Sequence, residues 1–465
     1  MQGLSSQASR AHGRTCAASR VAASTSPRFG LRTIARKRPI AMSLEPSERR
    51  QRVPIISILA LASALLLWWS FPSELPLWRG IAIVSAWLGT AMLAVCTVLM
   101  VREPHLARAL GGLERCYLWH HRFGVFAYLA VVVHPLALAL DGWTESPHVA
   151  WASLAPWLLA WPVWLGWGAL VLIMGGLAAT FNRRLTYRRW RGLHHLLGIG
   201  VLLAFSHVWI LLGEPAPPLG IVAIGVLALS WRLLAADLGL AALPYRVTAV
   251  GHPAAGVIEA SIAPRGAALA VVPGQFVLAA FDRDPHYRGC GEYHPFTVSA
   301  IEAEHRLRVT VKGLGSCSTR LQALEPGALL RLQGPFGSFL SEAADRPELW
   351  IAGGIGITPF IAALRAEPRV TPTTLIYLYR TAADAAFLEE LASLASKDAN
   401  FKLIANATGD RPPAVETLTA GIAQLTERRV YLCGPAAMVD AMTRGLIELG
   451  TPPGNIRYER FDFRL

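Results

Sequence analysis

The sequence has no closely spaced cysteine pairs and little charge. Six cysteines occur among 465 residues, and no two of them form a Cys-x-x-Cys motif. Plant-type iron–sulfur clusters, zinc knuckles and covalently attached c-type haem all need such spacing, so the chain has a local motif for none of them. Charged residues make up only 16% of the chain and hydrophobic residues 53%, which is typical of a membrane protein with a soluble part.

Acidic residues are absent from the first 41 positions, which contain seven Arg and one Lys. This segment supplies +8 of the formal net charge of +13, so the remaining +5 gives no reason to expect a nucleic-acid partner. It also lacks the apolar run of a signal peptide. We expect residues 1–48 to be a disordered basic extension. A true start at Met42 is favoured, and an organellar transit peptide is the alternative.

Long apolar stretches dominate the next part of the chain. Six of them approach or exceed the ~20 residues that cross a bilayer, although the first is marginal: 54–71, 80–101, 117–140, 152–179, 190–212 and 217–238. Arginines precede the first stretch and fill the loops after the second and fourth, whereas the alternate loops are acidic. We therefore expect residues 49–240 to form a six-helix bundle in the cell membrane (inner or plasma), with both termini in the cytoplasm.

Four histidines lie at two matched depths in these stretches: His120 and His134 in the third, His194 and His207 in the fifth. An imidazole ring in hydrocarbon needs a partner or a metal, and no acidic residue at mid-depth could complete a di-metal site. We predict that these histidines are the axial ligands of two stacked haems, an inner one (His120, His194) and an outer one (His134, His207). Without a Cys-x-x-Cys-His motif, both haems are expected to be non-covalent and b-type.

Adjacent histidines leave the inner ligands open to choice. Residues 14 apart, such as His120 and His134, lie within ~40° of each other around a helix, whereas His121 would point ~140° away from His134. Helix geometry therefore favours His120. His194 and His195 both miss the face of the outer ligand, so geometry does not decide between them.

The chain changes character after Pro244, where short β-rich runs alternate with Gly and Pro turns. Residues 244–345 predict a small antiparallel β-barrel, and residues 346–465 predict a parallel α/β domain of repeated strand, Gly-rich turn and helix. The barrel contains two candidate cofactor-binding runs. In the first run, the proline restricts the residue before it to extended backbone, and a threonine then offers a hydroxyl group on the strand. This run is His294, Pro295, Phe296 and Thr297. The other is a small-residue turn suited to phosphate oxygens: Gly315, Ser316, Ser318 and Thr319.

The α/β part contains three strand ends with nucleotide-binding character. The first carries glycines that let the backbone approach a pyrophosphate: Gly353, Gly354 and Gly356, followed by Thr358. The second ends at Arg380 and lacks an acid for a ribose 2′-hydroxyl, which favours NADPH over NADH. The third ends at Cys433, Gly434 and Pro435.

The order of these motifs resembles the ferredoxin–NADP reductase family of flavoprotein modules. Fused behind paired histidines, it resembles the ferric reductase and NADPH oxidase superfamily over residues 50–465. The resemblance implies FAD at Thr297 and at residues 315–319, and nicotinamide near residues 353–358, Cys433 and Gly434. It also implies 13-residue spacing of the ligands in the fifth span, and hence His194 rather than His195.

A C-terminal aromatic stacked on the flavin is implied as well, and we assign it to Phe461, with Phe463 as the alternative. Such a flavocytochrome b would carry electrons from cytosolic NADPH (or NADH) through FAD and two haems to the outer face. The acceptor could be O2, a ferric chelate or a periplasmic redox protein, because the short outer loops offer only Arg79 and His148 as basic residues. A different hypothesis is a membrane-anchored NAD(P)H-dependent flavin or ferredoxin-type reductase whose membrane half is structural or a haem sensor.

Overall fold

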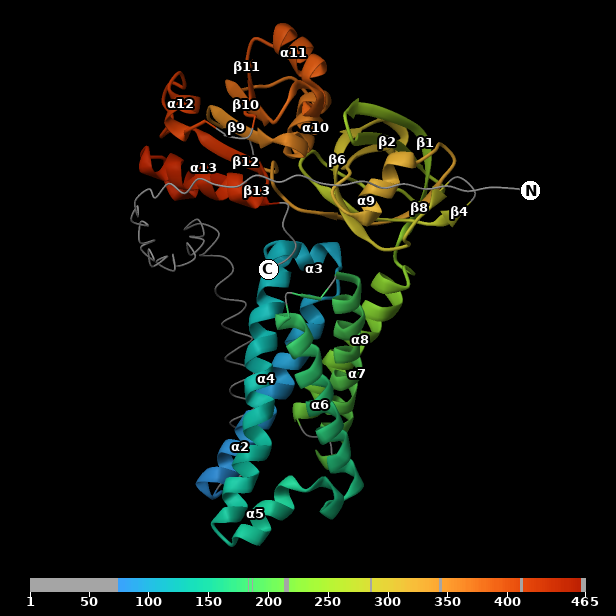
Figure 1. Ribbon diagram of the computed structural model, residues 1–465, viewed down its shortest axis with the longest axis vertical. Coiled ribbons are helices and arrows are strands. Elements are labelled where there is room, and N and C mark those ends of the chain that lie inside the picture. The colour runs from blue at the N-terminus through green and yellow to red at the C-terminus, as the bar shows by residue number, and fades with distance from the viewer. Residues whose placement is uncertain are drawn as a thin grey trace, which may run out of the picture. The chain divides into compact units, whose positions relative to one another are not determined.

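The computed structural model describes residues 74–460, except 183, 186, 213–216, 285–286, 343–344 and 410–412. The basic extension, the first predicted span, Phe461 and Phe463 lie outside the described residues. Within that part, five helices are long and apolar enough to cross a membrane (Figure 1): α2 (Leu77–Leu99), α4 (Leu113–Trp143), α6 (Trp161–Phe181), α7 (Tyr187–Leu212) and α8 (Pro217–Trp231), which continues as the π-helical η2 (Arg232–Asp237). The five later spans of the predicted bundle are therefore present.

The fourth predicted span, 152–179, is wrong at its start. The structure divides this region into α5 (Pro147–Leu154), a 3-10 turn η1 (Pro156–Leu158) and α6, which begins only at Trp161. Ala155 stands before Pro156 and adopts an extended conformation, with ψ 95°. A residue before proline is sterically disfavoured in the helical region, so the apolar run breaks there although its composition stays hydrophobic.

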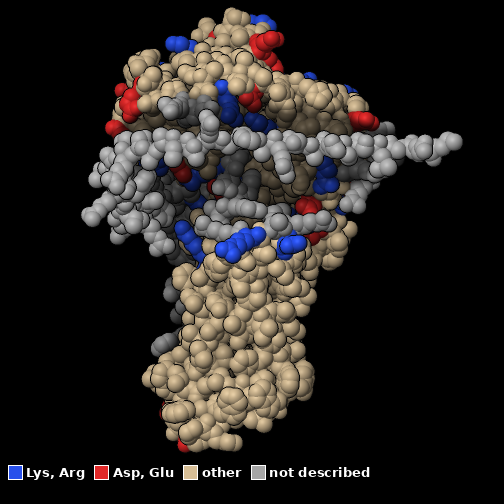
Figure 2. Space-filling model, viewed as in Figure 1, with Lys and Arg blue, Asp and Glu red and all other residues tan. Residues whose placement is uncertain are grey.

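The helices pack in a bundle with α2 along α4 and α6 along α7. Its interior includes Leu93, Ala127, Ile173 and Phe205. Most of the visible bundle surface bears no charge, and Lys and Arg side chains gather at one end of it (Figure 2). The short α3 (Pro104–Ala109) joins α2 to α4.

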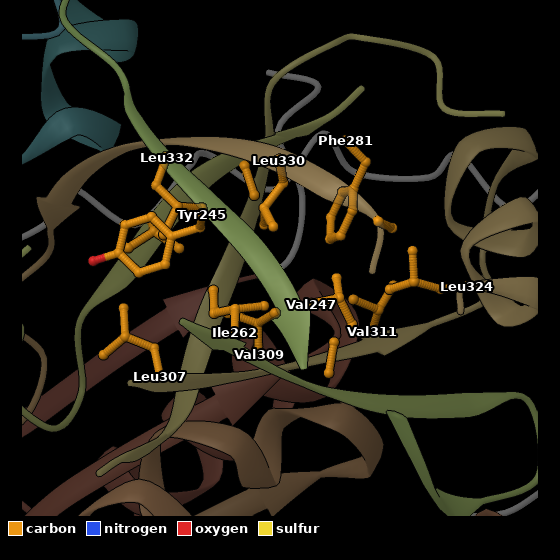
Figure 3. Packing of buried hydrophobic residues seen from close by; sticks show 14 of the residues in the cluster. Tyr245, Val247, Ile262, Phe281, Leu307, Val309, Val311, Leu324, Leu330 and Leu332 are labelled. Carbon is orange, nitrogen blue, oxygen red and sulfur yellow. The ribbon is translucent and has the colours of Figure 1, made fainter. Parts of the chain in front are cut away.

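A closed antiparallel barrel follows the bundle, as predicted, with strand order β1-β2-β7-β6-β3-β8. Its strands are β1 (Leu243–Ala254), β2 (Val257–Pro264), β3 (Phe276–Phe281), β6 (His294–Ile301), β7 (Leu307–Lys312) and β8 (Leu329–Phe336). The short β4 (Arg283–Asp284) and β5 (Tyr287–Arg288) pair separately, and the one-turn α9 (Ser316–Arg320) follows β7. Alternate residues of the strands fill the interior, where Tyr245, Ile262, Val309 and Leu330 are almost completely buried (Figure 3).

The last domain is a parallel five-stranded sheet with the order β11-β10-β9-β12-β13. Its strands are β9 (Glu348–Gly353), β10 (Thr373–Tyr379), β11 (Phe401–Ala407), β12 (Arg429–Gly434) and β13 (Ile456–Arg460). The main helices are α10 (Thr358–Ala366), α11 (Leu388–Lys397), α12 (Val415–Thr419) and α13 (Ala436–Glu448). One sheet face packs on α10 and α11 and the other on α12 and α13, which explains the continuous apolar runs of its central strands.

Arg365 of α10 joins the sheet domain to the barrel. Its guanidinium donates to Glu259 of β2 at 2.6 Å and to both carboxylate oxygens of Glu390 at 2.7 Å. The planar fork of the guanidinium forms two parallel hydrogen bonds with Glu390, which makes this contact directional. The two carboxylates hold the pKa of Arg365 above its usual range, against the opposing effect of burial, so the cation persists at any physiological pH.

Candidate functional site

Two histidines from different helices face each other near the end of the bundle that adjoins α3. The ring centroids of His120 (α4) and His194 (α7) are 6.2 Å apart, with an interplanar angle of 69°. Nδ1 of His120 lies 3.1 Å from the carbonyl oxygen of Cys96, to which it donates. Nδ1 of His194 lies 3.4 Å from the hydroxyl of Thr180, and Trp190 stacks on the same ring at 5.1 Å.

Their sequence neighbours lie differently. His121 and His195 are exposed on the surface of the described chain, and the ring of His121 has an edge contact with Phe181 at 6.4 Å. His120 and His194, in contrast, are both half-buried. The structure thus brings one histidine of each adjacent pair together and leaves the other outside the bundle.

The second pair of histidines is held by backbone carbonyls. Nδ1 of His134 (α4) lies 2.9 Å from the carbonyl oxygen of Ala82, and Nδ1 of His207 (α7) lies 2.9 Å from that of Pro162. A carbonyl oxygen only accepts hydrogen bonds, so each Nδ1 carries the proton. This tautomer leaves Nε2 with its lone pair.

Such histidines fit axial ligands of a metal. Metal-bound imidazoles commonly donate their second N–H to a backbone carbonyl, which fixes both tautomer and ring orientation. Metal–imidazole bonds of about 2 Å on each side account for about 4 Å of a centroid separation. The 6.2 Å between the ring centroids of His120 and His194 would therefore accommodate one metal ion between the two imidazoles.

A glycine of α6 makes room for the ring of His207. A Cβ atom on Gly166 would lie 2.9 Å from Cε1 of His207 and 3.1 Å from both ring nitrogens. Distances below about 3.4 Å put carbon atoms inside van der Waals contact. Gly166 is therefore the residue that allows α6 to approach this imidazole.

The α/β domain brings two of its glycine-rich strand ends together. In the sheet, β10 and β11 lie on one side of β9, and β12 and β13 lie on the other. This reversal is the topological switch point at which parallel α/β sheets bind ligands. Gly353 ends β9 and Gly354 directly follows it, while Cys433 and Gly434 end β12, so the predicted nucleotide-binding residues meet there.

Close packing at this point depends on Gly356. Its missing Cβ would lie 2.1 Å from the carbonyl oxygen of Cys433 and 2.9 Å from the amide nitrogen of Gly434. The next helix, α10, begins at Thr358, whose hydroxyl donates to the carbonyl of Ile355 at 3.0 Å. The strand, turn and helix start therefore form one compact cradle of backbone groups.

The other residues predicted to bind the nucleotide differ in how far they are exposed to solvent. Cys433 is completely buried, and burial raises the pKa of its thiol well above the usual range, so the thiol is protonated and neutral. Arg380 is exposed directly after β10, and its carbonyl accepts from the amide of Gly409 at 3.1 Å. Pro435 directly precedes α13.

The two predicted barrel runs also converge. Thr297 is buried on β6, where it pairs with Phe276 of β3, and the preceding His294, Pro295 and Phe296 are half-buried. Potential metal-binding atoms of His294 and of Cys317 in α9 lie within 4.8 Å of each other. In the turn before α9, the hydroxyl of Ser318 accepts from the amides of Leu314 and Gly315, while Ser316 and Thr319 are exposed.

Sequence reasoning missed one acidic residue of this region. Glu459 of β13 pairs in register with Cys433, and its Oε1 lies 3.5 Å from the position a Cβ would take on Gly337, directly after β8. Burial, with a smaller effect from Glu114, raises the pKa of Glu459 to about 8, so the carboxyl is mostly protonated at pH 7. The only sign of this residue in the sequence is that a single acidic residue, Glu459, lies within the last strand.

Two family models match separate parts of the chain. Residues 85–205 match a ferric reductase like transmembrane component, and residues 350–444 match an oxidoreductase NAD-binding domain. The reductase component of propane 2-monooxygenase from Rhodococcus jostii is 28% identical over 237 residues, which are 46% of this chain and 62% of that protein. The electron transfer component of toluate 1,2-dioxygenase from Pseudomonas putida is 28% identical over 207 residues, 42% of this chain and 59% of that protein.

The chain thus spans about six tenths of the length of these relatives, at 62% and 59%. Among solved structures, the ferredoxin reductase in carbazole 1,9a-dioxygenase is 25% identical with a TM-score of 0.41, covering 48% of this chain and 69% of that chain. The flavohem-like FAD/NAD-binding domain of nitric oxide dioxygenase from Vibrio cholerae is 23% identical with a TM-score of 0.43, covering 47% and 98% respectively.

Proposed function

We propose that this chain, which joins a ferric reductase-like transmembrane domain to a FAD- and NAD(P)-binding oxidoreductase module, carries electrons across a membrane. The route runs from cytosolic NAD(P)H through FAD and two b-type haems to an acceptor on the outer face. The arginine-rich loops support the cytoplasmic placement of the module. When bound, FAD accepts a hydride and the haem irons carry single electrons.

The facing pair of His120 and His194 is the observation that carries this proposal. Their separation of 6.2 Å suits one iron between them, and the Nδ1 proton of His120 is directed to a carbonyl oxygen. A lone buried histidine could donate to the same carbonyl, but it would not need a second imidazole at this distance. His134 and His207, each tied to a carbonyl through Nδ1, are assigned to the outer haem.

The reductase module has a role for each of its converging segments. We assign FAD to residues 294–297 and 315–319, and the pyrophosphate of NAD(P)H to the glycine cradle at the switch point of the sheet. We assign Arg380, which is exposed directly after β10, to the 2′-phosphate of NADPH. The aromatic that stacks on the flavin is assigned to Phe461.

A ferric chelate or O2 is the proposed acceptor on the outer side. If two histidines ligate each haem, the iron would have no free position, and an acceptor would have to take electrons at the haem edge. Of the two basic residues expected there, Arg79 donates to the buried carboxylate of Asp141 at 2.7 Å. His148 is exposed. Both basic side chains are exposed, so an anionic chelate could meet either of them.

Gly166→Ala is expected to reduce outer-haem content, whereas Gly175→Ala in the same helix leaves it unchanged. The added methyl would press on the His207 ring at 2.9 Å, while a Cβ on Gly175 has nothing within 4 Å. Displacing a ligand's ring orientation typically costs about 10 to 100-fold in metal affinity. Haem per chain, measured by pyridine haemochrome assay, tests this. Equal haem content in the two variants would contradict the assignment of His207.

Flavin reduction by NADPH is expected to slow as the pH rises through about 8, where Glu459 ionises. Below this pH the carboxyl is neutral. Above it, a buried negative charge opposes the transfer of further negative charge to the neighbouring site, so the rate falls several-fold. Glu459→Gln cannot ionise and should lose this pH dependence. Stopped-flow rates between pH 6.5 and 9.5 provide the measurement, with exposed Glu448→Gln as the control. If Glu459→Gln keeps the wild-type pH profile of flavin reduction, ionisation of Glu459 is not what slows the reaction.

The proposed function as a whole is tested in proteoliposomes. The full chain, loaded with FAD and haem, receives NADPH on one face and ferric citrate or O2 on the other. Reduction of the acceptor only across the membrane, at a rate matching NADPH oxidation, is the expected result. Turnover only when NADPH and acceptor share one face would instead support the membrane-anchored reductase whose membrane half is structural or a haem sensor.

A further inference from the structure

Four potential metal ligands converge where the segment entering β6 meets α9. Cys290, Glu292 and His294 come from that segment, and Cys317 comes from α9. One ligand atom from each of the four residues lies within 4.8 Å of the others. The sulfur of Cys290 lies 3.3 Å from Nε2 of His294. Two sulfurs, an imidazole nitrogen and a carboxylate oxygen are thus gathered around one point.

The donor set selects the metal. Mg²⁺ and Ca²⁺ take oxygen ligands, whereas two thiolates and one imidazole suit Zn²⁺. Zinc bonds of about 2.0 to 2.3 Å place the ligand atoms of a tetrahedral site within about 4 Å of one another. Small side-chain movements from the observed spread of up to 4.8 Å would therefore close the shell.

Neighbouring charges hold two of the four ligands. Arg191 of α7 pairs with Oε1 of Glu292 at 2.9 Å, which leaves the second carboxylate oxygen for a metal. Arg320 donates to the sulfur of Cys317 at 3.6 Å, and a zinc-bound thiolate can still accept this hydrogen bond. Outer contacts of this kind orient metal ligands. All four ligands are half-buried, so an ion can enter from solvent.

We propose that Cys290, Glu292, His294 and Cys317 bind one Zn²⁺ that fastens the segment entering β6 to α9. Two of the ligands, His294 and Cys317, belong to the runs assigned above to FAD. With zinc on these two side chains, FAD would be held by Thr297 and by the backbone and hydroxyl groups of residues 315–319, so the consequence for FAD rests on the proposed function. Metal binding itself does not. The competing use of the same cysteines is a disulfide between Cys290 and Cys317, which would remove both thiolates and exclude zinc.

The test counts zinc in the purified full-length protein. The protein is kept reduced with a phosphine, loaded with ZnCl2, dialysed and analysed by mass spectrometry of the metal and by X-ray absorption at the zinc edge. We expect about one zinc per chain, with sulfur neighbours at about 2.3 Å. Cys290→Ser/Cys317→Ser should lose at least ~90% of the metal, because serine is a poor zinc ligand.

Two further variants separate ligation from folding. Cys317→His supplies another zinc ligand and should keep the metal, whereas Cys116→Ser, a matched change at a buried cysteine of α4, should not affect it. Haem content and gel-filtration behaviour report whether each variant is folded. Failure of the reduced wild-type protein to retain zinc, equal zinc in the double variant, or a zinc shell without sulfur would each overturn the proposal.

The effect on FAD has its own readout. Removing zinc with a chelator should weaken FAD binding several-fold in the wild-type protein and should not change it in the zinc-free double variant. The zinc count needs neither FAD nor turnover. A protein that binds zinc but transfers no electrons would thus contradict the proposed function and leave the zinc site intact.

Discussion

His194→Ala is expected to remove the inner haem and to abolish electron transfer across the membrane, whereas His195→Ala should leave both unchanged. His194 faces His120 at 6.2 Å, and its neighbour His195 is exposed on the outside of the bundle. Losing an outer-shell contact of a metal site already costs about 10 to 100-fold, so loss of the ligand itself should cost at least ~100-fold in rate. The rate of acceptor reduction in proteoliposomes and the haem content together measure the effect.

The two variants also distinguish a loss of electron transfer through the haems from a loss of folding. In the proposed function, NADPH reduces FAD within the reductase module and not in the bundle, so this first step should proceed in His194→Ala at the wild-type rate. If haem content and transmembrane rate are instead lost in His195→Ala and retained in His194→Ala, the inner ligand has been assigned to the wrong residue. Loss in both variants would point to a general disturbance of α7.

Gly356→Ala is expected to disable the nucleotide-binding domain, whereas Gly421→Ala in the same domain should be tolerated. The new methyl group would lie 2.1 Å from the backbone oxygen of Cys433, but a Cβ on Gly421 has nothing within 4 Å. Overpacking usually costs about 1 to 3 kcal/mol, and backbone cannot rotate away as a side chain can. We expect the upper end of this range, which corresponds to about 100-fold in NADPH affinity or in folded domain.

The measurement is NADPH oxidation by the full chain with an artificial electron acceptor, at several NADPH concentrations. Proteolytic resistance of the α/β domain distinguishes a weakened site from an unfolded one. Wild-type kinetics in Gly356→Ala would show that the turn can move away from β12, and would contradict the rigid cradle described here.

Much of the architecture follows from local pattern. The barrel and the parallel sheet were predicted from period-2 alternation and from strand, glycine turn and helix repeats, because these patterns reflect which face each residue buries. The fourth span was misplaced because hydrophobicity alone does not reveal the break at Pro156. There the steric restriction of Ala155 by the following proline outweighs the apolar composition.

The site was predictable only in part, for a related reason. The spacing of the glycines at 353, 354 and 356 is enough to predict a nucleotide-binding turn, because residues without side chains let the backbone approach a pyrophosphate closely. Glu459 carries no comparable local signal. Its raised pKa arises from burial between Cys433 and the end of the barrel, and that environment exists only after β13 has joined the sheet.

The sequence by itself determined the order of domains, the apolar spans and the four histidines at matched depths, because length, periodicity and residue type are local properties of a chain. Helix geometry could not choose between His194 and His195, and only the family resemblance favoured His194; the tertiary structure shows that His194 faces His120. It alone gathered Cys290 and Cys317, which form no sequence motif, beside His294. Contacts between distant residues depend on how helices rotate and strands close around a core, and no local pattern records that geometry.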